Sequence, residues 1–286
     1  MNNNNYKNCC NCNDTSTPKS PEIFDSIHPY GWNIIPYPGE YLFPQPEERN
    51  ASSWPTCFLT KKDNLFYGLG ACPLNFPIKE ADLVFDFKKE FEYIYNISKF
   101  LTPKEIELAH YWGYGPPSKQ FTPILDILIT TYKVPACRAQ RMHYILHAAL
   151  NDACVVCWHY KYAFNVVRPV QYNPLFKPVL ATPRHPSYPA GHSVMAGCMV
   201  SILTYFFPSE AEKLYNLGVE CSVSRLYGGV HYKPDCDEGF VLGEFIGNTI
   251  IDIVSKDINS NHSKIDYQYN EFLDAPIIPD TSKQYI

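Results

Sequence analysis

Residues 185–207 read HPSYPAGHSVMAGCMVSILTYFF, a turn rich in proline followed by a long apolar run. From residue 194 onward, only one glycine, one serine and one threonine interrupt the apolar side chains. This run is shorter than the roughly 20 residues that a helix needs to cross a bilayer. It therefore predicts a helix over 191–207 that is buried in the core of a protein.

Helical patterns continue on both sides of this stretch. Residues 87–101 repeat apolar side chains with a period near 3.6, and Thr102-Pro103 has the cap and first-turn proline of a helix start. Thr122-Pro123 repeats that signal. Further helices are predicted over about 138–164, over 209–227 and from 235. No stretch alternates convincingly as a strand, so we expect an all-α protein with a helical bundle at its centre.

Two of these helices carry additional sequence signals. Ser209 with Glu212, and Asp235 with Glu238, have the spacing of a capping box. After Asp235, glycines recur every fourth residue at positions 239, 243 and 247. Glycine costs about 1 kcal/mol at a helix position. Three on one face therefore indicate a helix that packs closely against a neighbour.

The chain divides into three parts by composition. Residues 1–21 are rich in Asn and Cys and are expected to be disordered. Residues 22–260 form the predicted single helical domain, in which 22–85 is an irregular arm rich in Pro, Tyr and Trp. Residues 261–286 are a C-terminal extension.

The 11 cysteines suggest reduced thiols more than a disulfide framework, since a chain of 286 residues builds its own core. Cys9, Cys10 and Cys12 leave a small metal clip open. Cys154 and Cys157 have CxxC spacing but lie in an apolar helical pattern, which favours buried free thiols.

The net charge of −5 gives no general attraction for nucleic acid or for an anionic membrane. An anion site must therefore be made locally by converging cations. The N-terminus has no apolar segment of the secretory type. We expect a cytoplasmic protein that acts on small molecules, without a nucleic-acid or membrane partner; a homo-oligomer stays open.

Three segments carry residues suited to chemistry: KYAFNVVRP at 161–169, HPSYPAGH at 185–192, and SRLYGGVHYKPD at 224–235. They supply three permanent cations, Lys161, Arg168 and Arg225. Gly191 lets a backbone approach a ligand, and its N–H falls in the first turn of a helix, a position that favours anions.

The same segments supply groups that move protons. His192 and His231 can take up a proton or attack an electrophile near neutral pH. Asp235 follows His231 by four residues and can accept its second ring proton. Each residue alone is as well explained by a solvated charge, a core histidine or a helix cap. Together they describe a site for a tetrahedral oxyanion.

The three segments resemble the signature of the superfamily of vanadium-dependent haloperoxidases and PAP2-type acid phosphatases. That signature reads Lys-x6-Arg-Pro, then Pro-Ser-Gly-His, then Ser-Arg-x5-His-x3-Asp. The matching residues are Lys161, Arg168, Pro169, Pro189, Gly191, His192, Ser224, Arg225, His231 and Asp235. One departure is Ala190, which stands in the oxyanion-binding segment where the family usually has serine. A lost hydroxyl donor costs roughly 1–2 kcal/mol.

The resemblance implies two alternative activities at one site. In the haloperoxidase reading the cofactor is vanadate, His231 is the ligand to vanadium, and the three cations with the Gly191 N–H neutralise the oxygens. His192 then deprotonates hydrogen peroxide, and a halide is oxidised to hypohalous acid. In the phosphatase reading, His231 attacks a phosphomonoester to give a phosphohistidine, and His192 protonates the leaving alcohol.

Two neighbouring residues favour the haloperoxidase. Trp158, three residues before Lys161, resembles the tryptophan of the soluble haloperoxidases, and His185 resembles the histidine of the bromoperoxidases. These residues predict a halide pocket and a preference for bromide or iodide over chloride. An inactive oxyanion-binding protein is a third alternative, which Ala190 leaves open.

Overall fold

The computed structural model describes residues 31–281, and it is mainly helical: helices account for 56% and strands for 4% of these residues. The α-helices are α1 (Ala81–Val84), α2 (Phe87–Lys99), α3 (Pro103–Gly113), α4 (Ser118–Thr131), α5 (Ala136–Phe164), α6 (Pro169–Tyr172), α7 (Gly191–Phe206), α8 (Ala211–Tyr227) and α9 (Lys233–Val254). The expected all-α fold is confirmed. The predicted tail 1–21, with its three cysteines, lies outside the described residues.

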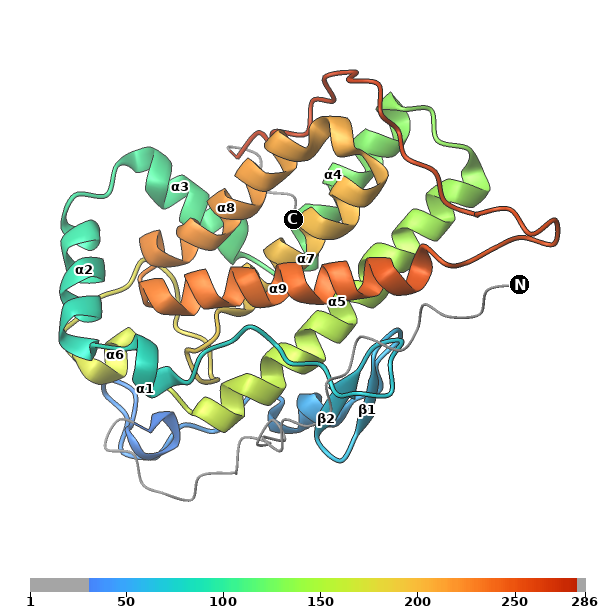
Figure 1. Ribbon diagram of the computed structural model, residues 1–286. Helices are drawn as coiled ribbons and strands as arrows, with labels where there is room; N and C mark the ends of the chain where they lie inside the picture. Colours follow the sequence, from blue (N-terminus) through green and yellow to red (C-terminus); the bar gives the residue numbers. More distant parts are fainter. Residues whose placement is uncertain (1–30, 282–286) are drawn as a thin grey trace.

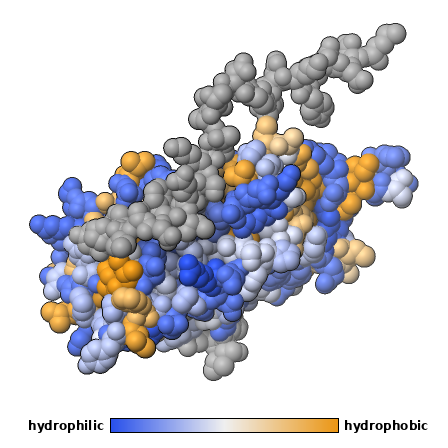
Figure 2. All heavy atoms as spheres, turned by 90° about the horizontal axis from the view of Figure 1, so that it is seen from below, coloured by the Kyte–Doolittle hydropathy of each residue, from blue (hydrophilic) through white to orange (hydrophobic). Residues whose placement is uncertain are grey.

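The long helices α5, α7, α8 and α9 form the centre of the bundle, and α2 and α3 lie together at one end (Figure 1). The apolar run of α7 is buried, as predicted: Val194, Cys198 and Ile202 are fully inaccessible to solvent. No helix of residues 31–281 combines the length and the apolar character that a membrane crossing requires. Seen from below, hydrophilic residues alternate with small apolar patches (Figure 2).

The glycine pattern of α9 has the predicted consequence. A Cβ at Gly243 would lie 2.0 Å from the carbonyl oxygen of Val194, and one at Gly247 would lie 3.0 Å from that of Cys198. Gly197 of α7 makes the reciprocal approach, 2.2 Å from the Phe240 carbonyl. The backbones of α7 and α9 therefore touch, which fixes the start of α7 against the start of α9.

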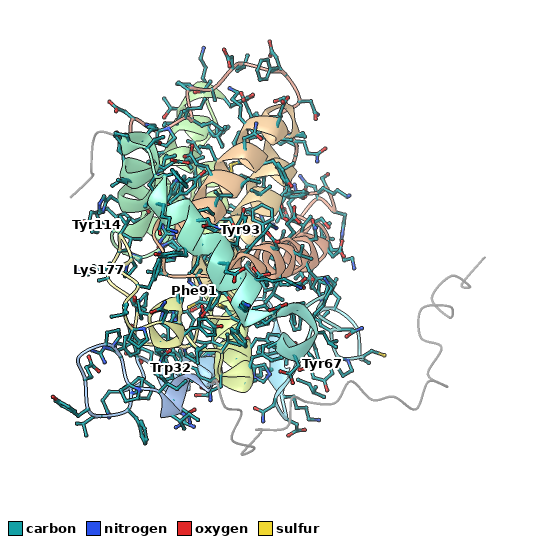
Figure 3. The ribbon with its side chains drawn as sticks, turned by 90° about the vertical axis from the view of Figure 1, so that its left-hand side faces the viewer. Trp32, Tyr67, Phe91, Tyr93, Tyr114 and Lys177 are labelled. Carbon is teal, nitrogen blue, oxygen red and sulfur yellow. The ribbon has the colours of Figure 1, made fainter. Side chains whose placement is uncertain are left out.

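The arm before α2 is not wholly irregular. It contains 3₁₀ turns at Trp32–Ile34 and Arg49–Ser53 and an antiparallel hairpin of β1 (Thr60–Lys62) and β2 (Leu65–Tyr67). A buried carboxylate of α5, Asp152, holds the arm by accepting N–H groups from Cys57, Phe58 and Leu59 at 2.6–2.9 Å. Figure 3 shows Trp32 and Tyr67 of this arm below α2, which carries Phe91 and Tyr93.

Three predicted helix starts are corrected. Helix α4 begins at Ser118, so Pro123 lies inside it and the Thr122 hydroxyl bonds back to the Ser118 carbonyl rather than capping. The Ser209 hydroxyl donates to carbonyls of the C-terminal segment, so α8 starts at Ala211 without a capping box.

The third correction concerns α9, which begins at Lys233. Asp235 is its third residue and accepts the Tyr232 N–H instead of capping with Glu238, which pairs with Lys79. This places the Asp235 carboxylate beside His231.

Candidate active site

A cavity of about 700 Å³ lies where the three sequence segments converge. Six of the predicted site residues line it: Trp158, His185, Gly191, His192, Arg225 and His231. The other four, Lys161, Arg168, Ala190 and Asp235, are fully buried directly behind this lining. The structure thus brings the predicted residues together in two layers, and their chemical roles stay predictions.

His231 is held by the carboxylate of Asp235. Its Nδ1 lies 2.8 Å from Oδ2 of Asp235, which also accepts the Ser187 hydroxyl and, at 3.0 Å, the Tyr232 N–H. Burial raises the pKa of Asp235 to about 6, so the carboxyl is ionised at neutral pH. Nδ1 of His231 therefore carries the proton, and Nε2 presents a lone pair.

Arg168 faces that lone pair. Its Nη1 lies 3.1 Å from His231 Nε2, and its Nη2 lies 3.0 Å from His185 Nδ1. Because a guanidinium donates and cannot accept, both histidine nitrogens are assigned as acceptors. The Pro186 carbonyl lies farther from His185 Nδ1, at 3.3 Å, so the shorter Arg168 contact favours a proton on Nε2 of His185. Burial, with Arg168 and Lys161 nearby, lowers the pKa of both histidines well below their usual range, so both are neutral.

The two ring nitrogens of His192 differ in their hydrogen-bond partners. Its ring bonds to the backbone carbonyl of Trp112, and its Nε2 is buried without a hydrogen-bond partner among the described residues. The protonated nitrogen is therefore Nδ1. Burial lowers the pKa of His192 well below its usual range, and Arg225 lowers it further. His192 is thus a neutral group with one free lone pair beside the cavity.

Lys161 donates hydrogen bonds to the turn that precedes α7. Its ammonium donates to the carbonyls of Pro186 and Ser187 at 2.9 Å and of Pro189 at 2.5 Å, which uses all three of its protons. Burial lowers its pKa to about 8. The lysine is predicted to help neutralise the anion; its ammonium does not line the cavity in this structure, and that role stays a prediction.

Arg225 is the cation that lines the cavity. Its Nε and Nη2 donate to the Ser224 hydroxyl, and Nη2 also reaches the Ala109 carbonyl at 3.2 Å. No hydrogen bond from its Nη1 is found within residues 31–281. Nη1 is thus the guanidinium nitrogen left for an anion.

The start of α7 completes the lining. A Cβ at Gly191 would meet the Trp158 ring at 3.7 Å, an ordinary van der Waals distance, and the glycine itself is a buried part of the lining. The neighbouring Ala190 packs into an apolar cluster with Tyr232, and its N–H donates to the Asp235 carbonyl at 2.8 Å. Its methyl group therefore supports the joint between α7 and α9.

Sequence reasoning did not identify two residues that bond to the site residues, Ser187 and Trp112. Ser187 was quoted as part of its motif, but its contact with Asp235 depends on the fold of the turn. Trp112 acts through its backbone carbonyl, from a helix outside all three segments, and no residue pattern signals such a contact. Of the CxxC pair, both thiols are free, with Cys157 buried and Cys154 half-buried at the cavity.

The donor set fits vanadate or phosphate. His231, whose Nε2 takes the Arg168 hydrogen bond in this structure, His192, whose Nε2 is unpartnered among the described residues, and Arg225 all line one cavity, in front of two buried cations. Within the described residues, no group of three or more His, Cys, Asp or Glu is arranged to hold a metal cation. The cations and N–H donors of the lining fit an anion, and anion binding stays a prediction.

Solved structures share this fold at low sequence identity. A bacterial vanadium-dependent iodoperoxidase is 22% identical, with a TM-score of 0.60 over 78% of this chain and 60% of its own. A bacterial vanadium-dependent chloroperoxidase in its holo form is 14% identical, with a TM-score of 0.57 over 75% of this chain and 56% of its own. The chain thus spans about three fifths of the length of these proteins.

The sequence itself matches none of the curated proteins compared with it. It does match the model of the PAP2 superfamily over residues 141–258. That segment contains the three cations, the three histidines and the aspartate of the site. The segment of the chain that holds the site is therefore similar to the PAP2 superfamily.

Proposed function

We propose that the protein is a vanadate-dependent haloperoxidase that oxidises bromide or iodide with hydrogen peroxide. One observation carries this choice. The rings of Trp158 and His185 lie 4.9 Å apart on the cavity wall, and the Trp158 N–H has no partner among the described residues. With the Nε2–H assigned to His185, two residues of the cavity lining each have an N–H donor without a partner among the described residues, which suits a halide.

The chain's own residues have distinct roles in this proposal. His231 would hold vanadate through Nε2, with Arg225 and the Gly191 N–H at its oxygens and with Lys161 and Arg168 adding charge from behind. Bound vanadate would supply a Lewis-acidic centre that makes hydrogen peroxide a stronger oxidant. His192 Nε2 accepts the peroxide proton and later returns it. Overall, halide, hydrogen peroxide and one proton give hypohalous acid and water.

Similar folds support the proposal, because the matched structures are named as an iodoperoxidase and a chloroperoxidase. The size of the cavity favours a second candidate, a phosphatase acting on phosphomonoesters. A volume of about 700 Å³ exceeds what an oxyanion and a halide need and would hold the organic part of an ester. His231 would then be the nucleophile and His192 the acid.

One experiment separates these candidates. Purified protein, incubated with orthovanadate or left without it, is assayed for triiodide formation from iodide and peroxide and for hydrolysis of p-nitrophenyl phosphate. We expect vanadate-dependent triiodide formation that His231→Ala abolishes and Lys119→Ala, at a cation outside the signature, retains. Vanadate-inhibited ester hydrolysis without halide oxidation would establish the phosphatase. Vanadate binding without either activity would indicate an inactive oxyanion-binding protein.

A further inference from the structure

The cavity extends well beyond the oxyanion site. A water molecule occupies about 30 Å³ of the liquid, and a tetrahedral oxyanion has only five heavy atoms. Most of the 700 Å³ therefore remains after an oxyanion and a halide are placed. The remaining volume lies in the range of pockets that hold small organic molecules.

The wall around this remaining space is largely apolar, and its polar residues are Ser118, His147, Asn151 and Cys154. Buried side chains of Leu150, Leu180 and Met195 form its inner part. Tyr114, Pro116, Pro117, Ala181 and Pro183 continue it outward. Among the described residues of the lining, only Arg225 and the solvent-exposed Glu47 carry a charge at neutral pH. Away from these two residues, a charged molecule would lose hydration without gaining a counter-ion.

The wall is formed in advance of any ligand. Buried Gln120 donates from its amide to the carbonyls of Tyr111 and Tyr114, at 2.5 and 3.2 Å, and so holds the loop between α3 and α4. Leu180 fits between two glycines: a Cβ at Gly113 or Gly228 would lie 2.6 or 2.7 Å from its Cδ1. Tyr114, at the outer edge of the molecule in Figure 3, stacks on His110 at 5.1 Å.

We infer that this wall binds the organic substrate of the reaction, an uncharged aromatic molecule of roughly 10–20 non-hydrogen atoms. Its position in the same cavity as His192 and His231 places the molecule beside the oxidised halide. The reaction part of this inference rests on the proposed haloperoxidase function, whereas binding does not. In the reaction, hypohalous acid and an aromatic C–H give a C–halogen bond and water, and the ring proton leaves with the hydroxyl.

Binding is tested with 2-naphthol, an uncharged fluorescent aromatic. Ala181→Trp and, independently, Ser118→Trp place an indole in the cavity lining, both at positions that are not buried. Ala71→Trp makes the same change at an exposed turn that is not part of the lining. We expect saturable binding to wild type and to Ala71→Trp, and at least tenfold weaker binding to both cavity variants, whose fold is checked by circular dichroism. Absence of saturable binding, or equal affinity in all four proteins, would overturn the inference.

Selectivity is tested in the same proteins with vanadate, peroxide and bromide. 2-Naphthol competes with 4-hydroxybenzenesulfonate, a charged aromatic, and the product ratio is compared with that given by free hypobromite. We expect wild type to raise the ratio in favour of 2-naphthol about tenfold, and Ala181→Trp to return it to the hypobromite value. An identical ratio for wild type and hypobromite would refute substrate binding during the reaction. If wild type oxidises no halide, the proposed function fails, while the binding measurement still decides the inference.

Discussion

Nη1 of Arg168 lies 3.1 Å from Nε2 of His231, the nitrogen opposite the one that faces Asp235. A guanidinium donor on one side and a carboxylate on the other leave His231 a single protonation pattern, with the lone pair on Nε2. The same guanidinium fixes His185 through Nη2 at 3.0 Å. One buried arginine therefore sets the tautomers of two histidines.

Replacing this arginine with lysine tests that relationship. Arg168→Lys keeps the charge but cannot reach both histidines, because an ammonium lacks the planar fork of donors. We expect vanadate affinity to fall roughly 10–100-fold and the ¹⁵N shifts of both imidazoles to change. Arg184→Lys, at an exposed arginine paired with Glu40, is the control and should alter neither. Unchanged imidazole shifts in Arg168→Lys would contradict the assignment.

Replacing His192 and replacing His231 should have different effects on vanadate binding and turnover. His192→Ala should bind vanadate nearly as tightly as wild type but lose about 10²–10⁴-fold in turnover, the usual effect of a lost proton-transfer group. His231→Ala should lose both tight binding and turnover, because it removes the ligand itself. Thermal-shift titration with vanadate and steady-state kinetics measure the two effects. Full turnover in His231→Ala would refute the site assignment.

The pKa of Asp235, whose carboxylate bonds to His231, should set the acid limb of the pH–activity profile. Burial raises the pKa of Asp235, the Ser187 hydroxyl lowers it in part, and the net value is about 6. Since Asp235 must be ionised to accept the His231 proton, Ser187→Ala should move the acid limb to higher pH. Asp235→Asn should lower vanadate affinity roughly 10–100-fold, to between those of His192→Ala and His231→Ala. Ser193→Ala, at a buried serine that bonds to Ser222, is the matched control and should leave the limb in place.

Stability should fall as the pH drops below about 6.5. The pKa values of His185, His192 and His231 are lowered in the folded state, so the unfolded chain binds protons first. Each histidine that stays neutral in the folded state then lowers the free energy of unfolding by about 1.4 kcal/mol for each pH unit. Asp235, with its pKa raised to about 6, takes up a proton in the folded state below that pH and offsets one histidine. Urea unfolding at pH 7.5, 6.5 and 5.5 measures this; equal or greater stability at pH 5.5 would contradict it.

The contact of α7 with α9 should tolerate no side chain at Gly243. A Cβ there would lie 2.0 Å from the Val194 carbonyl oxygen, so Gly243→Ala must push the two helices apart. We expect a loss of about 3 kcal/mol in the free energy of unfolding, at the upper end for overpacking. Gly70→Ala meets nothing closer than 3.9 Å and should change stability by less than about 0.5 kcal/mol. Equal unfolding midpoints for the two variants would show that the helices can separate freely.

The sequence alone determined the helical class, the buried character of α7 and the close approach of α9. These properties follow from local periodicity and from side-chain size, which a linear pattern records. The observed helix starts at Ser118, Ala211 and Lys233 differ from the starts that the sequence predicts. The reason is that residues such as Ser209 bond to segments distant in the sequence. Their partners exist only after the chain has folded.

For the site, spacing named the residue types, and the tertiary structure decided which atoms face the cavity. Lys161 and Arg168 carry the same charge as Arg225, yet only Arg225 lines the cavity, because the other two donate to carbonyls and histidines behind it. The Trp112 carbonyl at His192 and the wall of Leu150, Leu180 and Met195 belong to no motif. Backbone atoms and apolar side chains acquire a role only from their position, and a sequence pattern does not record position in three dimensions.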